Sequence, residues 1–250
     1  MSARVSTAAA VLLGTALLAW IVTFQRMAGM DAGPATDLGG LGWYVGVWVT
    51  MMAAMMLPSV TQMVLLFARV GRAPTWIFLA GYLAAWTAYG LLAYGVFQTI
   101  RSLRLDFLAW HRAGPYLAGA AVAAAGLYQL LPLKDACLRH CRTPLHFVVH
   151  GWRDGRLGAL RMGAEHGLYC VGCCFGLMVV LFALGVMSLF WIAVIAAVIF
   201  AEKVTPLGAR LRRPLAVALA LLGVWVAAAP SSVPGLTQPD RAPAMARTAP

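Results

Sequence analysis

Seven apolar segments constrain the fold of this chain more than any other feature. They lie near residues 8–24, 42–68, 75–98, 114–131, 166–187, 190–202 and 214–229. A helix of about 20 apolar residues crosses the roughly 30 Å hydrocarbon core of a bilayer, so most of these segments are long enough to span it. The sixth is short. The sequence therefore predicts an all-α, polytopic transmembrane helical bundle of six to seven helices, forming a single domain over residues 1–230.

The basic residues predict the orientation of this bundle. A net charge of +11 in a soluble protein would suggest a nucleic-acid partner, but here the basic residues flank apolar spans and meet lipid head groups instead. We expect the lipid bilayer as partner and no nucleic acid. With a cytoplasmic N-terminus, thirteen of the nineteen basic residues lie inside: Arg4, Arg69, Arg72, Lys134, Arg139, Arg142, Arg153, Arg156, Arg161, Lys203, Arg210, Arg212 and Arg213.

That orientation places the loop at residues 132–162 in the cytoplasm, while the tail at residues 231–250, rich in Pro, Ala and Ser, is expected to be disordered. It also places all five cysteines on or near the cytoplasmic side, where stable disulfides are rare. Thiolates acting as metal ligands or redox groups are then the favoured interpretation of these cysteines.

The cysteines form two clusters with helical spacing. At about 100° per residue, one face of the fifth apolar segment carries His166, Cys170, Cys173 and Cys174. A helix of about ten residues starting at residue 132 would put two more candidates, Cys137 and Cys141, one turn apart on one face, with His140 alongside. Soft sulfur ligands select Cu(I), Zn(II) or iron–sulfur clusters. We favour Cu(I), with Zn(II) as the other candidate; buried cysteines that only pack remain an alternative.

Methionines form a stripe on the second apolar segment. Met51, Met52, Met55 and Met56 fall within roughly 140° of one another, and Trp48, Ser59, Gln62 and Met63 extend the same face. Thioethers are uncharged ligands that suit Cu(I), so the stripe is a candidate path for the ion; ordinary packing is the alternative. Pro58 is expected to interrupt or kink this helix.

Three spaced motifs resemble the signature of a bacterial family described as predicted metal-binding integral membrane proteins. They are WVTMMAAMMLPS (residues 48–59), YQLLPLKDACLRHCRTP (128–144) and HGLYCVGCCFGLM (166–178), followed by Glu202-Lys203, within a match over residues 42–203. The resemblance implies a multi-helix membrane protein with a metal site, located in the bacterial cytoplasmic (inner) membrane. The family carries no established substrate, and the choice of ligands rests on the residues themselves.

The sequence thus favours a membrane protein that binds a soft metal ion in transport, delivery or homeostasis, with a soluble metal chaperone or a membrane complex as candidate partner. A thiol-disulfide oxidoreductase using Cys170/Cys173 is one alternative, and a non-catalytic helical subunit or assembly factor is another. The chain has no nucleophile elbow, phosphate loop or HExxH motif, so an enzyme is less favoured. Lys134, Arg139 or Arg161 is expected to offset the charge of the thiolates, and Glu202 to pair with Lys203 or a nearby arginine.

Overall fold

The computed structural model describes residues 3–28, 38–70, 73–103, 110, 112–205 and 208–236, and within these residues it contains helices and no strand. Most residues of each of the seven apolar segments lie in helices, which confirms the all-α prediction. The helices are α1 (Ala3–Met27), α2 (Leu41–Val70), α3 (Thr75–Ser102), α4 (Gly114–Tyr128), α5 (Pro132–Arg142), α6 (Pro144–Gly151), α7 (Gly155–Leu184), α8 (Leu189–Val204) and α9 (Gly208–Ala228).

Fewer helices than expected are long and apolar enough to cross a membrane by themselves. Five pass that test in the described chain: α1, α2, α3, α7 and α9. The helices α4 and α5 together make a sixth candidate, bent by 64° where they join. Helix α8 has only 16 residues. Length and composition therefore support five or six spans instead of seven, and the crossing itself stays a prediction.

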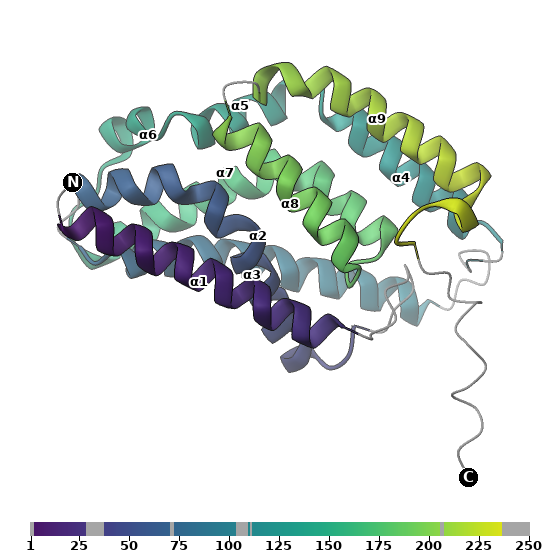
Figure 1. The fold of residues 1–250 in the computed structure, drawn as a ribbon, viewed down its shortest axis with the longest axis horizontal. Helices are drawn as coiled ribbons and strands as arrows, with labels where there is room; N and C mark the ends of the chain where they lie inside the picture. Colours follow the sequence, from purple (N-terminus) through teal and green to yellow (C-terminus); the bar gives the residue numbers. More distant parts are fainter. Residues whose placement is uncertain are drawn as a thin grey trace, which may run out of the picture.

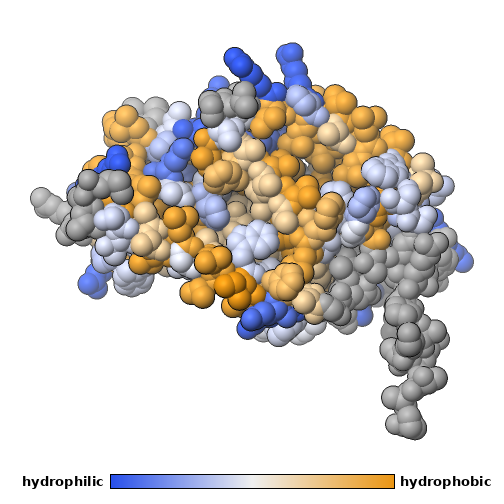
Figure 2. All heavy atoms as spheres, viewed as in Figure 1, coloured by the Kyte–Doolittle hydropathy of each residue, from blue (hydrophilic) through white to orange (hydrophobic). Residues whose placement is uncertain are grey.

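Helix α7 occupies the middle of the bundle. It packs against α3, α4, α5 and α8, while α1 lies along α2 and α9 lies along α4 at the opposite side (Figure 1). Helix α8 contacts both α2 and α9. Apolar side chains cover much of the face seen in Figure 2, as expected for helices that meet lipid. This arrangement brings side chains from α2, α3, α5 and α8 toward the α7 cysteines.

Glycines allow α3 and α7 to approach closely. A Cβ atom at Gly81 of α3 would overlap the carbonyl oxygen of Leu160, and one at Gly163 of α7 would overlap the carbonyl oxygen of Phe78. Only glycine fits at such a backbone contact, which is the usual basis of small-residue packing between membrane helices. The contact fixes the position of the cysteine face of α7 relative to α3.

Several local expectations change in the structure. The 132–162 loop is mostly helical: α5 covers residues 132–142 as expected, α6 follows, and α7 already begins at Gly155. Helix α2 continues through Pro58 without a break. Gln62 is exposed and so does not extend the methionine stripe, because the helix turns this position away from the bundle.

The first part of the expected disordered tail packs against α8. Val233 is buried, and the Ser188 hydroxyl donates a hydrogen bond of 3.1 Å to the carbonyl oxygen of Gly235. The rest of the tail, residues 237–250, lies outside the described residues.

Candidate metal centre

Three thiols from α7 form the centre of the site. Cys170, Cys173 and Cys174 occupy positions i, i+3 and i+4 of one helix, which places them on one face. Each is at most 2% exposed, and their sulfur atoms all lie within 4.8 Å of one another. The Sγ atoms of Cys173 and Cys174 are 3.6 Å apart. The predicted face of α7 is therefore a compact, buried group of three sulfurs.

Helix α5 adds a fourth sulfur to this group. The bend after α4 lays α5 against α7, and the Sγ of Cys141 lies 3.7 Å from the Sγ of Cys173. Sulfurs in a tetrahedron around an ion at about 2.3 Å would lie about 3.8 Å apart. The two measured sulfur separations are thus close to those of a metal–thiolate site.

Cys137 lies at the flank of the group. It is half-buried, and its sulfur packs so closely against Gly172 that a Cβ atom there would lie 2.7 Å from it. Helix α5 therefore packs against the side of α7 that contains Gly172. All five cysteines are free, and none is joined in a disulfide.

Lys203 brings a positive charge to the sulfurs. Its Nζ donates a hydrogen bond of 2.7 Å to the Sγ of Cys170, and the hydroxyl oxygen of Tyr82 lies 2.9 Å from the same sulfur. Lys203 is only 6% exposed. A buried ammonium is costly unless an anionic or strongly accepting group faces it. Cys170 is such a group, so Lys203 is the counter-charge of the sulfur group.

The expected sources of counter-charge have other roles. Lys134 is buried, but its Nζ contacts both carboxylate oxygens of Glu202 at 2.8 Å and also donates to the side-chain oxygen of Gln129. Arg139 and Arg161 are exposed. The prediction that one of these three residues would offset the charge of the thiolates was wrong. Glu202 pairs with Lys134, and the adjacent Lys203 contacts the sulfur of Cys170 instead.

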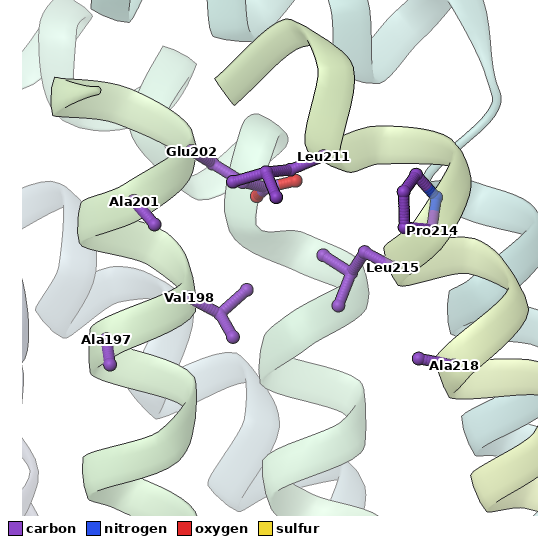
Figure 3. A pocket seen from close by; sticks show the side chains of 8 residues that line it. All are labelled: Ala197, Val198, Ala201, Glu202, Leu211, Pro214, Leu215 and Ala218. Carbon is purple, nitrogen blue, oxygen red and sulfur yellow. The ribbon is translucent and has the colours of Figure 1, made fainter. Parts of the chain in front are cut away.

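The sequence suggested that Glu202 pairs with Lys203 or a nearby arginine at the membrane surface. In the structure, Glu202 and Lys203 have different partners. Glu202 is 2% exposed and pairs with α5, while Lys203 reaches α7. The other side of Glu202 closes a largely apolar groove of about 420 Å³ between α8 and α9 (Figure 3). The Lys134–Glu202 pair is electrically neutral and ties α5 to α8 beside the sulfurs.

The two candidate histidines differ in their surroundings. His166 is 2% exposed, its ring lies among those of Phe78, Tyr82 and Phe147, and its Nδ1 has no hydrogen-bond partner within the described structure. An unpartnered buried nitrogen one turn before Cys170 is a candidate ligand. His140 instead stacks on Tyr169 with ring centroids 4.2 Å apart and donates from Nδ1 to the Ala136 carbonyl oxygen.

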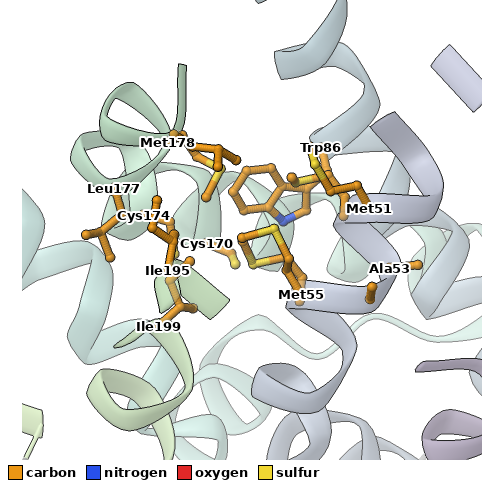
Figure 4. Close-up of a cluster of buried hydrophobic side chains, with 14 of the residues drawn as sticks. Met51, Ala53, Met55, Trp86, Cys170, Cys174, Leu177, Met178, Ile195 and Ile199 are labelled. Atoms are coloured by element: carbon orange, nitrogen blue, oxygen red, sulfur yellow. The ribbon is translucent and has the colours of Figure 1, made fainter. Parts of the chain in front are cut away.

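The methionine stripe is buried in the same core as the cysteines. Met51, Met52, Met55 and Met56 are each at most 1% exposed. Figure 4 shows Met51 and Met55 of α2 across from Cys170 and Cys174 of α7, with Trp86 between the two helices. Thioethers therefore lie in the cluster of buried side chains that includes the thiols.

Sequence reasoning missed Lys203 and Tyr82 as parts of the site. A lysine at the end of an apolar segment resembles an ordinary interfacial anchor, and only its burial distinguishes it. Tyr82 lies on α3, 88 positions from Cys170 in the chain, and the one local signal is its neighbour Gly81, which permits the close helix contact.

This fold and this site define a helical, apolar bundle with a buried group of thiols of the kind that holds soft metal ions. Residues 45–226, which include all five cysteines, match the family described as PpoB2, copper chaperone. The chain belongs to this copper chaperone family. A search of curated proteins and a search of solved structures give no match.

Proposed function

We propose that the protein binds one Cu(I) ion through Cys170, Cys173, Cys174 and Cys141, inside the cytoplasmic membrane, and holds it for delivery to an acceptor. The observation that carries the proposal is the three buried sulfurs of α7 within 4.8 Å of one another. Thiolates and thioethers prefer Cu(I) among the metals available to such a site. Membership of a copper chaperone family supports the same metal.

Lys203 supplies part of the charge compensation that a Cu(I)–thiolate complex needs at this site. Four thiolates with Cu(I) carry three negative charges, which the Lys203 ammonium reduces to two. Burial makes this compensation valuable, since water cannot screen the charges there. His166 would complete the ligand set where the ion takes a nitrogen, because its Nδ1 is buried and has no partner in the described residues.

The methionines of α2 support a route for the ion to and from the thiols. Met51 and Met55 present uncharged sulfur in the core that also contains Cys170. A soft ion can pass between such ligands without a counter-charge at each step. Thiols hold Cu(I) more firmly than thioethers, so the route would serve loading and release, and the cysteines would store the ion.

Binding and delivery can be tested separately. Detergent-purified, reduced protein should take up one Cu(I) per chain in competition with a chromophoric chelator, and Cys170→Ser/Cys173→Ser should take up none. The loaded protein should then transfer Cu(I) to a soluble copper-binding acceptor faster than free diffusion through buffer containing chelator allows. Wild-type protein that stays copper-free but forms a disulfide on oxidation would contradict the proposal and favour the oxidoreductase.

The membrane orientation has its own test. A reporter fused at Gly155 should report the cytoplasm, because thirteen of the nineteen basic residues then lie on that side. A reporter signal from the opposite side would contradict the proposed orientation. It would also remove the argument that the cysteines face a reducing compartment, and so favour the oxidoreductase.

A further inference from the structure

A basic cavity lies apart from the sulfurs, where the α4–α5 bend meets the start of α9. It has a volume of about 790 Å³ and is lined by Leu130, Asp135, Arg210, Arg212 and Arg213. Three guanidinium groups and one carboxylate give the cavity two net positive charges. A cavity of this sign and size is suited to an anion.

Among the described residues, Arg212 is the one of the three arginines that pairs with a carboxylate. Arg212 forms an ion pair with Asp135, and its Nε donates a hydrogen bond of 3.1 Å to the carbonyl oxygen of Gln129. Arg210 and Arg213 are exposed, and neither has a carboxylate partner within the described chain. Arg212 therefore forms part of the cavity wall, whereas the guanidinium groups of Arg210 and Arg213 are accessible to a ligand.

The cavity lies at the edge of an apolar surface. The candidate membrane span of α9 begins at Arg210. The neighbouring α4 and α9 expose apolar side chains, including Leu127 at 70%, Val217 at 59% and Leu221 at 66%. Hydrophilic side chains project from the edge where α9 begins, and apolar side chains cover the helices below it (Figure 2).

We propose that this cavity binds the phosphate head group of an anionic phospholipid, whose acyl chains lie along the exposed apolar surface of α4 and α9. The proposal rests on the proposed membrane location. Basic pockets between helices at the cytoplasmic edge of a membrane are suited to such head groups. A free phosphate shares the charge but gains nothing from the apolar side chains, so charge and surface together favour the lipid.

The site has a structural consequence for the copper centre. Arg212, one of the arginines that line the cavity, also pairs with Asp135 of α5 and donates a hydrogen bond to the backbone of Gln129, where α4 and α5 join. Helix α5 carries Cys141. A lipid head group bound at this joint would hold α5 against α7 and so stabilise the position of the fourth sulfur.

Native mass spectrometry of the full chain in detergent tests the proposal. The wild-type protein is titrated with phosphatidylglycerol, with phosphatidylcholine and with inorganic phosphate. Phosphatidylglycerol should bind most tightly, and Arg210→Gln/Arg213→Gln should weaken it about 30-fold, since each arginine near an anionic lipid contributes roughly fivefold. The control Arg156→Gln/Arg161→Gln removes two exposed arginines on the same predicted side and should retain the affinity.

Three outcomes would overturn the proposal. Equal binding of the two lipids by wild-type protein would remove the charge preference, and this comparison needs no variant to fold. Equal weakening in both double variants would indicate general surface charge. Binding of inorganic phosphate as tight as that of phosphatidylglycerol would assign the cavity to a soluble anion. Copper stoichiometry measured on the same samples reports the proposed function independently.

Discussion

Replacing Lys203 by methionine should shift the metal preference of the site from Cu(I) towards Zn(II). With the same thiolate ligands, a Cu(I) complex is one charge more negative than a Zn(II) complex. The Lys203 ammonium therefore favours Cu(I) over Zn(II), and Lys203→Met removes this advantage. Methionine keeps the length and apolar stem of lysine, so packing is largely retained.

The structure sets the magnitude. The Nζ of Lys203 is 2.7 Å from the Sγ of Cys170. An ion bound to that sulfur at about 2.3 Å then lies at most about 5 Å from the ammonium. One unit of charge at this separation and an effective dielectric constant of about 20 corresponds to about 3 kcal/mol, or a change of roughly a hundredfold in the Cu(I)-to-Zn(II) preference.

Competition titrations with chelators for each metal measure that ratio. Lys203→Arg keeps the positive charge and should stay within about tenfold of the wild type. The neutral double substitution Lys134→Met/Glu202→Met removes the nearby buried pair without changing the net charge, so it should preserve the ratio. An unchanged ratio in Lys203→Met, or an equal change in the neutral control, would refute the charge argument.

Three further predictions concern stability and the route of the ion. Glu202→Gln leaves its partner lysine on α5 buried without a carboxylate and should lower the free energy of unfolding by about 3–5 kcal/mol, measured by thermal or denaturant unfolding in detergent; a change below about 1 kcal/mol would contradict a structural role for the pair. Met51→Leu/Met55→Leu should cost under about 1.5 kcal/mol of stability but slow Cu(I) loading, measured by stopped-flow chelator exchange, and an unchanged rate would reduce the stripe to packing. Gly81→Ala should destabilise by about 1–3 kcal/mol because its Cβ would overlap the α7 backbone, whereas Gly95→Ala on the same helix, with open space around it, should be neutral or stabilising.

Helical periodicity was sufficient to predict much of the architecture and the sulfur face. The α7 cysteines share a face because positions i, i+3 and i+4 always do. The expected helix of about ten residues starting at residue 132 is α5. The direction in which α5 folds back depends on the 64° bend after α4, which no local pattern specifies. Consequently the contact between Cys141 and Cys173 was a hypothesis that only the tertiary structure could address.

The burial of charged side chains could not be predicted from the sequence. Glu202 and Lys203 are adjacent at the end of an apolar helix, and this position suggested an exposed ion pair. In the structure they face α5 and α7 respectively, because successive helical positions point about 100° apart and both neighbours are packed against α8. Which of two adjacent charges meets the sulfurs depends on the rotation of α8 about its axis, and periodicity alone does not fix that rotation.

X-ray absorption at the copper edge of the Cu(I)-loaded, reduced protein tests most directly whether the cysteines of α7 bind copper. We expect a first shell dominated by three or more sulfurs at about 2.3 Å, as is typical of thiolate ligands. Cys173→Ser should lose at least one sulfur from that shell. A shell of nitrogen or oxygen alone, or a sulfur shell that is unchanged in both Cys170→Ser and Cys173→Ser, would contradict the assignment of copper to the cysteine face of α7.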